Sequence, residues 1–170
     1  MIILEGPDGS GKTTLGRRLS ALHGIPLVKR DKQDAYLWCM SELSSWSLSG
    51  LKIYDRFALV SEYIYGPLRR GAKAVEFELD YQPTAEMMER FVRDALIIYC
   101  RPPATVIMRN VRETSQPTDI KGITTQAIGA YDEWFTHMNH VLFDYTTDTP
   151  ESLYEVIHQH RVAWERTCLL

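Results

Sequence analysis

The chain has 170 residues, of which 45% are apolar and 24% are charged, and its formal net charge is −3. This length and composition suit a single globular domain with a sizeable core. The weak negative charge excludes a general attraction to nucleic acid but leaves room for a local basic groove, and no apolar run approaches the ~18 residues of a membrane span.

An apolar run, Met1–Leu4, opens the chain and suits a buried parallel strand. No charged leader precedes it, so we expect a cytoplasmic protein that makes no membrane contact. A glycine-rich segment follows, and then Leu15, Leu19 and Leu22 recur at helical spacing. Strand, glycine-rich segment and helix in this order are the setting that a phosphate-binding loop requires.

The glycine-rich segment matches the pattern G-x-x-x-x-G-K-[ST] without a mismatch. Its glycines let successive backbone N–H groups curl around a polyphosphate, and the N-terminus of the next helix adds partial positive charge. In such loops Lys12 would reach the β- and γ-phosphates, and the Thr13 hydroxyl would bind Mg²⁺. We therefore predict ATP and Mg²⁺ as cofactors, although the loop alone does not separate a kinase from a GTPase or a motor ATPase. The predicted cofactor-binding residues are Gly6, Asp8, Gly9, Ser10, Gly11, Lys12, Thr13 and Thr14.

Strand and helix patterns alternate along the rest of the chain. Such alternation predicts a single α/β domain over residues 1–170, with a five-stranded parallel sheet and ligands beyond the carboxyl ends of its strands. The further strands are expected at 25–28, 51–54, 95–100 and 141–143, and the further helices at 31–47, 84–95, 123–139 and 150–165.

Residues 75–81 show a different pattern, in which apolar and acidic residues alternate. Period-two patterning predicts an extended, half-buried segment. It is interpreted as an edge segment with a solvated acidic face, and a partner contact or an acidic lip on the site stays open.

Asp55 and Arg56 directly follow the strand expected at 51–54, so both side chains should emerge at the ligand edge of the sheet. A carboxylate there can hold Mg²⁺, directly or through water, which makes Asp55 a predicted metal residue together with Thr13. An arginine there can bridge donor and acceptor phosphates.

The loop Gly6-Pro7-Asp8-Gly9-Ser10-Gly11-Lys12-Thr13-Thr14, together with Asp55-Arg56-Phe57 and the downstream Ser61, Tyr63, Tyr65 and Gly66, resembles the thymidylate kinase family. That family carries G-x-D-G-x-G-K-T-T and D-R-Y/H-x-x-S-x-x-A-Y-Q-G. The resemblance spans most of the chain and implies a three-layer α/β/α fold with strand order 2-3-1-4-5. The compact length resembles bacteriophage-encoded members, whose products act in the host cytoplasm, and family members are often homodimers.

The resemblance also implies roles for single residues. Asp8 would contact the acceptor sugar, Arg56 would grip the acceptor phosphate and the transferring group, and Asp55 would serve the metal and catalysis. Lys12, Asp55 and Arg56 are thus predicted catalytic residues. The predicted substrate-binding residues are Asp8, Arg30, Arg56, Tyr65, Arg69 and Arg70.

Some members of the family place a catalytic arginine inside the phosphate loop, where this chain has Gly9, so the chain resembles members that supply this arginine from a lid. The lid is expected at about 109–122, around the polar, turn-like stretch 113–119. Arg109 and Arg112 are predicted as catalytic lid residues, and the sequence does not separate them; a solvated loop with incidental cations is the alternative.

The chain departs from the family pattern in the regions expected to bind the acceptor, about 29–50 and 56–82. Ser61 falls one residue late, Tyr63-Ile64-Tyr65-Gly66 replaces A-Y-Q-G, and the stretch 30–50 is short. Arg101 stands at the end of the fourth strand, where an acidic or small residue is commoner. The donor side is unaffected, but the identity of the acceptor stays open.

Three functions follow from these residues. The first is transfer of the γ-phosphoryl group of ATP to a deoxynucleoside monophosphate such as dTMP, with a nucleotide substrate as partner. The second is a kinase for a hydroxyl group, either of a nucleoside or of 5-hydroxymethyluracil in phage DNA, where Asp8, Asp31 or Asp55 would take the proton; only this alternative needs nucleic acid. The third is a non-catalytic nucleotide-binding module, which would need a defect in the loop or in the Asp55-Arg56 pair that the sequence does not show.

Overall fold

The computed structural model describes residues 1–29, 35–45, 50–70, 84–114 and 118–168. Its centre is a five-stranded sheet in the order β2-β3-β1-β4-β5, and every strand pair is parallel. The strands are β1 (Ile2–Glu5), β2 (Leu27–Lys29), β3 (Ile53–Asp55), β4 (Leu96–Cys100) and β5 (Val141–Phe143). The helices are α1 (Lys12–His23), α2 (Ala35–Ser45), α3 (Ala58–Arg70), α5 (Ala85–Asp94), α6 (Ala104–Glu113), α7 (Thr118–Phe135), the 3-10 helix η1 (Pro150–Leu153) and α8 (Tyr154–Cys168).

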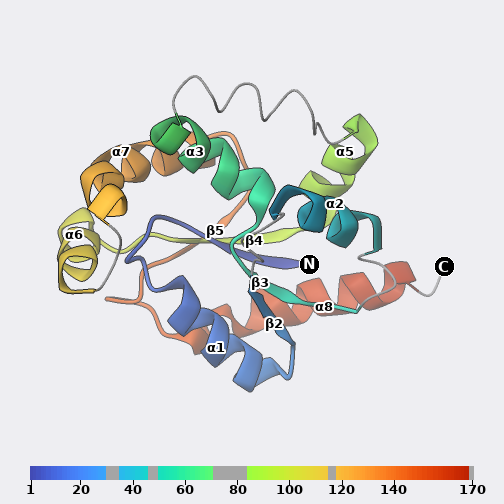
Figure 1. Cartoon of the computed structure of the whole chain (residues 1–170). Helices are drawn as coiled ribbons and strands as arrows, with labels where there is room; N and C mark the ends of the chain where they lie inside the picture. The colour runs from blue at the N-terminus through green and yellow to red at the C-terminus, as the bar shows by residue number, and fades with distance from the viewer. Residues whose placement is uncertain (30–34, 46–49, 71–83, 115–117, 169–170) are drawn as a thin grey trace.

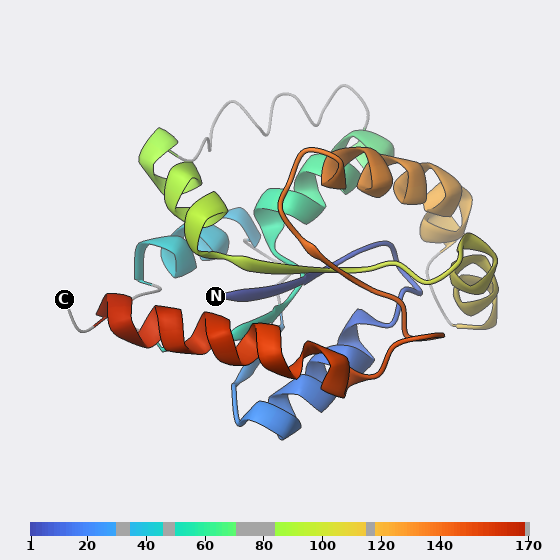
Figure 2. The same ribbon diagram turned by 180° about the vertical axis from the view of Figure 1, so that it is seen from behind.

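The central strand β1 is buried along its whole length, because helices cover both faces of the sheet. Figure 1 shows α1 and α8 on one face and α2, α3, α5 and α7 on the other, and the reverse view in Figure 2 shows the same layers. Side chains alternate across a strand, so Ile2 and Leu4 enter the core shared with α1 and α8, while Ile3 enters the core on the other face.

The predicted strands and their order are confirmed. The crossovers between parallel strands are helical, as βαβ units require, and the carboxyl ends of β1, β3 and β4 therefore meet at one edge. The phosphate loop leaves β1 at this edge, and α6 lies beside it (Figure 1).

Several helix boundaries differ from the sequence-based expectation. No helix is expected over 58–70, yet α3 occupies this range; Phe57 starts it by accepting the N–H groups of Val60 and Ser61 through its carbonyl oxygen. Gly66-Pro67 favours a turn by composition, but packing against α7 and α2 outweighs that local preference. The segment 75–81 lies outside the described residues.

Two late helices also start elsewhere than expected. α7 begins at Thr118 and ends at Phe135, so it starts five residues earlier than the range 123–139. The range 150–165 is divided, with Pro150 at the first position of η1 and α8 following from Tyr154. Within the described part of the chain, none of the helices combines the length and apolar character needed to cross a bilayer.

Candidate active site at the phosphate loop

The phosphate loop and the Asp55-Arg56 pair are brought together by the register of two neighbouring strands. Leu4 of β1 lies opposite Asp55 of β3, and the backbone N–H of Arg56 donates to the Leu4 carbonyl oxygen over 3.1 Å. The chain leaves β1 for the loop one residue after Leu4 pairs, so both predicted functional segments emerge at the same edge of the sheet.

Lys12 is buried inside its own loop, with 5% of its surface exposed. Its Nζ donates to the carbonyl oxygens of Gly6 and Pro7 over 2.8 and 2.7 Å, and to the Ser10 hydroxyl over 3.2 Å. Burial, together with the nearby positive charge of Arg56, lowers the pKa of Lys12 to about 8. The ammonium group is therefore held at the loop, where a polyphosphate would raise its pKa again.

Two glycines give the loop its shape. Gly9 and Gly11 have φ angles of 81° and 86°, in the left-handed region that side chains disfavour. A Cβ on Gly9 would also lie 3.0 Å from the carbonyl oxygen of Ile107 on α6. A side chain at position 9 would therefore crowd α6 in this chain, and the source of a catalytic arginine stays a prediction.

Thr13 and Asp55 form an oxygen pair beside the loop, because the Thr13 hydroxyl donates to Asp55 Oδ2 over 2.6 Å. Hydroxyl and carboxylate oxygens are ligands that Mg²⁺ accepts, usually together with waters and substrate phosphates rather than in an all-protein cage. Among the described residues, no group of three or more His, Cys, Asp or Glu side chains could hold a metal by itself. The donor set present fits a magnesium ion that is shared with a nucleotide.

Asp8, Arg56 and Tyr65 form a second cluster next to the loop. Arg56 Nη2 donates to Asp8 Oδ1 over 2.6 Å, the guanidinium lies 4.9 Å from the centre of the Tyr65 ring, and the Asp8 N–H donates to the Tyr65 hydroxyl over 3.0 Å. Burial alone would raise the pKa of Asp8, but the charges of Arg56 and Lys12 outweigh it and hold that pKa below its usual range. Asp8 is thus a carboxylate at neutral pH.

Two residues that support Arg56 were not predicted from the sequence. Glu5, the last residue of β1, is fully buried; its Oε1 accepts the N–H of Phe57 over 2.6 Å, and its Oε2 accepts the hydroxyl of Tyr131 on α7 over 2.9 Å. Burial raises the pKa of Glu5, although these two donors and the charge of Arg56 oppose the shift. The signal in the sequence was an acidic residue directly after an apolar strand.

We expect Tyr131→Phe to lower the free energy of unfolding by about 1–3 kcal/mol, because it leaves a buried carboxylate oxygen without its donor. Chemical denaturation measures this loss. The matched control is Tyr63→Phe, the same change at a side chain that is 62% exposed, which should stay within about 0.5 kcal/mol of the unchanged protein. Equal effects of the two substitutions would contradict a stabilising hydrogen bond from the Tyr131 hydroxyl to Glu5.

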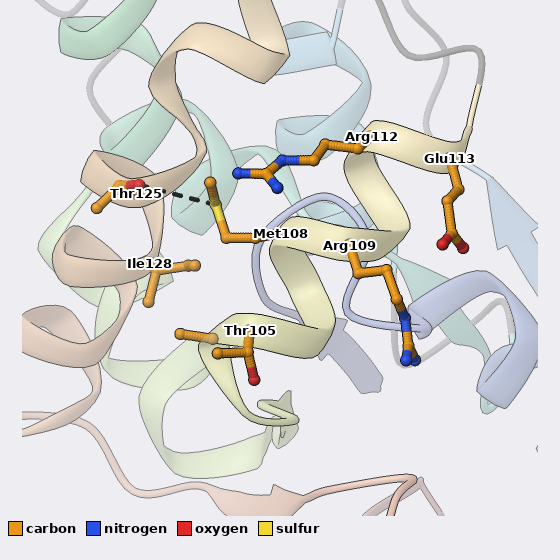
Figure 3. A pocket seen from close by; sticks show the side chains of 8 residues that line it. Thr105, Met108, Arg109, Arg112, Glu113, Thr125 and Ile128 are labelled. Atoms are coloured by element: carbon orange, nitrogen blue, oxygen red, sulfur yellow. Dashed lines mark hydrogen bonds between the residues drawn. The ribbon is translucent and has the colours of Figure 1, made fainter.

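The two candidate lid arginines lie on a helix, which corrects the expectation of a turn-like lid. α6 continues to Glu113 and α7 begins at Thr118, so both ends of the expected lid range 109–122 are helical, and 115–117 lie outside the described residues. Figure 3 separates the two side chains: Arg112 points across a pocket of about 660 Å³ toward α7, whereas Arg109 points away from α7. The structure therefore distinguishes two residues that the sequence could not.

The remaining predicted substrate-binding residues are exposed, have a side chain that is not described, or lie outside the described part of the chain. Arg69 is exposed on α3, Arg70 ends that helix with a side chain that is not described, and Arg30 lies outside the described residues, as does Asp31. Arg101 has a structural partner, since its Nε and Nη2 donate to the two carboxylate oxygens of Asp132 on α7 over 2.7 and 2.8 Å.

No protein-family model and no curated protein sequence matches this chain. Its fold is similar to that of several solved proteins, among them kinases. The YorR protein from Bacillus subtilis, solved in complex with phosphorylated GDP, is 17% identical, with 98% of this chain and 97% of that chain covered and a TM-score of 0.68. Deoxyadenosine kinase from M. mycoides with bound dCTP is 15% identical, with 94% and 98% covered and a TM-score of 0.63. A gluconokinase from Sinorhizobium meliloti 1021 is 12% identical, with 98% and 92% covered and a TM-score of 0.51. At these identities the likeness establishes the fold, and the resemblance to thymidylate kinases stays a prediction from the motifs.

Proposed function

We propose that this protein is an ATP-dependent phosphotransferase that moves the γ-phosphoryl group of ATP to a deoxynucleoside monophosphate similar to dTMP. The observation that carries the proposal is the pair of clusters beside the phosphate loop. Thr13 with Asp55 supplies the oxygen ligands for a metal, and Arg56 with Asp8 supplies a guanidinium and a carboxylate for an acceptor. Solved kinases with the same fold, among them a deoxyadenosine kinase and a gluconokinase, are consistent with a phosphotransferase activity.

Each group has a defined task in such a transfer. The loop amides and Lys12 hold the donor phosphates, and magnesium bound near Thr13 and Asp55 would neutralise part of their charge. Arg56 exchanges its contact with Asp8 for the acceptor phosphate and thereby lines up donor and acceptor. Of the two α6 arginines, Arg112 points across the pocket toward α7, whereas Arg109 points away from α7. We therefore assign the completion of the site to Arg109. No strong base is needed, since a monophosphate is already ionised.

A deoxynucleoside is the second candidate acceptor, and one observation favours it. Asp8 is a carboxylate at neutral pH and so has the ionised form that takes a proton from an attacking hydroxyl group; the Arg56 charge that lowers its pKa also weakens it as a base, and an acceptor that draws Arg56 away would restore its basicity. A solved structure with this fold is a deoxyadenosine kinase. The two candidates assign different work to Asp8: positioning a sugar for a monophosphate, and taking a proton for a hydroxyl group.

Transfer assays with labelled ATP and Mg²⁺ test the proposal against deoxynucleoside monophosphates, deoxynucleosides and DNA that contains 5-hydroxymethyluracil. Phosphorylation of a monophosphate supports it. Transfer only to a deoxynucleoside or only to DNA would show that the acceptor is a hydroxyl group and not a monophosphate. Binding of ATP without any transfer would make the protein a nucleotide-binding module.

Asp8→Asn separates the first two acceptors further. With a monophosphate acceptor we expect mainly a higher KM, because Asn keeps a hydrogen-bonding oxygen for the sugar. With a hydroxyl acceptor we expect kcat to fall by about 10²–10⁴-fold, since the general base is lost. The ratio of the two effects in steady-state kinetics identifies the role of Asp8.

Nucleotide binding should take up a proton above pH 8. The pKa of Lys12 is about 8 in the empty loop, and phosphate oxygens stabilise its charged form, so binding raises the pKa. At pH 7 the amine is already mostly charged and little uptake is expected, whereas at pH 9 about 0.9 of a proton should be taken up per ADP bound. The affinity for ADP should accordingly fall as the pH rises above 8.

Titration calorimetry at pH 9, in two buffers with different ionisation enthalpies, measures this uptake. Lys12→Arg serves as the control, because a guanidinium stays charged at this pH and has no proton to gain. Uptake of the same size in this variant would assign the proton to another group.

A further inference from the structure

Asn110, on α6, links the phosphate loop to the segment that follows β5. Neither the motifs nor the proposed reaction gives this residue a role. Its Nδ2 donates to the carbonyl oxygen of Gly9 in the phosphate loop over 2.8 Å and to the hydroxyl of Tyr145 over 2.6 Å. A carbonyl oxygen only accepts hydrogen bonds, so the amide nitrogen, and not the amide oxygen, must face Gly9. The bond spans 101 positions of the chain.

Tyr145 follows β5 and reaches the loop at a second point. A Cβ on Gly11 would lie 2.9 Å from Cδ1 of the Tyr145 ring, so the ring is seated directly against that glycine. The loop that carries Tyr145 is itself held by a turn, in which the N–H of Thr146 and the hydroxyl of the same residue donate to Asp144 Oδ1. The ring is therefore presented by a short, internally bonded segment.

Asn110 and Tyr145 contact the loop at Gly9 and Gly11, two positions where the loop backbone has the most conformational freedom. Gly9 and Gly11 both adopt positive φ, and glycine loses more conformational freedom on ordering than any other residue. A phosphate cradle binds an anion well only when its amides already point inward. Asn110 binds a carbonyl group from outside the loop, and the Tyr145 ring covers the second glycine.

We propose that Asn110 and Tyr145 form a clamp that holds the phosphate loop in its anion-binding shape and ties it to α6, the helix that carries Arg109. Asn110 is then a positioning residue for donor binding, and it acts on nucleotide affinity without touching the phosphates. The inference rests on the proposed function in one respect, namely that the loop binds a nucleoside polyphosphate.

The variant Asn110→Leu tests the clamp, because leucine has the same number and branching of side-chain heavy atoms as asparagine but donates no hydrogen bond. Titration calorimetry with Mg-ADP, and separately with inorganic tripolyphosphate, measures binding to the loop. We expect affinity for both probes to fall roughly tenfold. In turnover, KM for ATP should rise by a similar factor while KM for the acceptor changes less than about twofold, since Asn110 bonds to Gly9 and Tyr145, whereas the proposed acceptor cluster is the Arg56–Asp8 pair.

Tyr145 is tested by two further variants. Tyr145→Phe keeps the ring on Gly11 and removes only the hydroxyl group, so the loss should be smaller than in Asn110→Leu. Tyr145→Ala removes the ring and should weaken tripolyphosphate as much as ADP. If Tyr145→Ala weakened ADP alone, the ring would contact the base of the nucleotide and the clamp would reduce to Asn110.

Asn139→Leu is the matched control, because Asn139 is exposed and lies outside the loop. Unchanged binding of both probes in Asn110→Leu would overturn the inference, and so would equal changes in the two KM values. If the unchanged protein bound ADP but transferred phosphate to no acceptor, the proposed function would fail while the binding comparison still decided the clamp. If it bound neither probe, both proposals would fall.

Discussion

Replacing Arg56 with glycine should reduce phosphoryl transfer by about 10³–10⁵-fold, the range for arginines that stabilise a transferring phosphoryl group, yet leave the protein more stable than the alanine variant. Among the residues that the structure describes, Arg56 is the only one besides glycines with a positive φ angle, and its value is 75°. A Cβ in this region costs about 1–2 kcal/mol, and glycine removes that cost while alanine keeps it.

The strain is maintained by the contacts around Arg56. The N–H groups of Arg56 and of Phe57 bond to the Leu4 carbonyl oxygen and to Glu5, which fixes the peptide units on both sides of Arg56. Burial would lower the pKa of Arg56, but Tyr131, Asp8, Tyr65 and Glu5 together raise it, so the guanidinium is charged at any relevant pH. Strain of this kind is kept where a side chain must be aimed, and here it aims the guanidinium at Asp8 and the loop.

Chemical denaturation of Arg56→Gly and Arg56→Ala measures the difference, which we expect to favour glycine by about 1 kcal/mol. Both variants lose the ion pair with Asp8, so that loss cancels in the comparison. Arg56→Lys is the control for charge, because it restores the cation without the planar fork and should recover only part of the activity. Equal stability of the glycine and alanine variants would show that the backbone at Arg56 is relaxed in solution, and activity near that of the unchanged protein would place the active site elsewhere.

Lys12→Met should abolish measurable turnover, with a loss on the order of 10³-fold or more, because it removes the buried charge that faces the migrating phosphoryl group. Methionine keeps the unbranched stem of the side chain and removes only the ammonium group. Lys12 is also the donor to the carbonyl oxygens of Gly6 and Pro7, so the variant loses the contacts that keep these groups turned inward.

Steady-state transfer assays and titration calorimetry with the acceptor distinguish these effects. Acceptor binding should stay within about twofold, since Asp8 and Arg56 remain, while ADP binding weakens and kcat collapses. Circular dichroism checks that the fold is retained. A variant that kept near-normal turnover would mean that Lys12 serves only to hold its own loop.

Features that a short stretch of sequence signals could be predicted, and features that depend on packing could not. The phosphate loop is a local pattern, since nine consecutive residues and the strand and helix beside them carry the whole signal. The sheet order followed from the resemblance, and the alternation of strands and helices predicted its parallel arrangement. In contrast, α3 was not predicted because Gly66-Pro67 favours a turn locally. The lid was predicted as a loop because the residues at 113–119, where α6 ends and α7 begins, are polar and resemble a turn in the sequence.

The sequence by itself determined the parallel α/β sheet, the phosphate loop on its first crossover and the placement of Asp55-Arg56 at the carboxyl edge, because short stretches of consecutive residues signal each of them. Only the tertiary structure decided how those groups are held. The bond from Tyr131 to Glu5 spans 126 positions and the bond from Asn110 to Gly9 spans 101, so no local pattern records them. The physical reason is that a buried carboxylate or a loop carbonyl group takes whichever donor the packing of distant helices delivers, and that packing is a property of the whole fold.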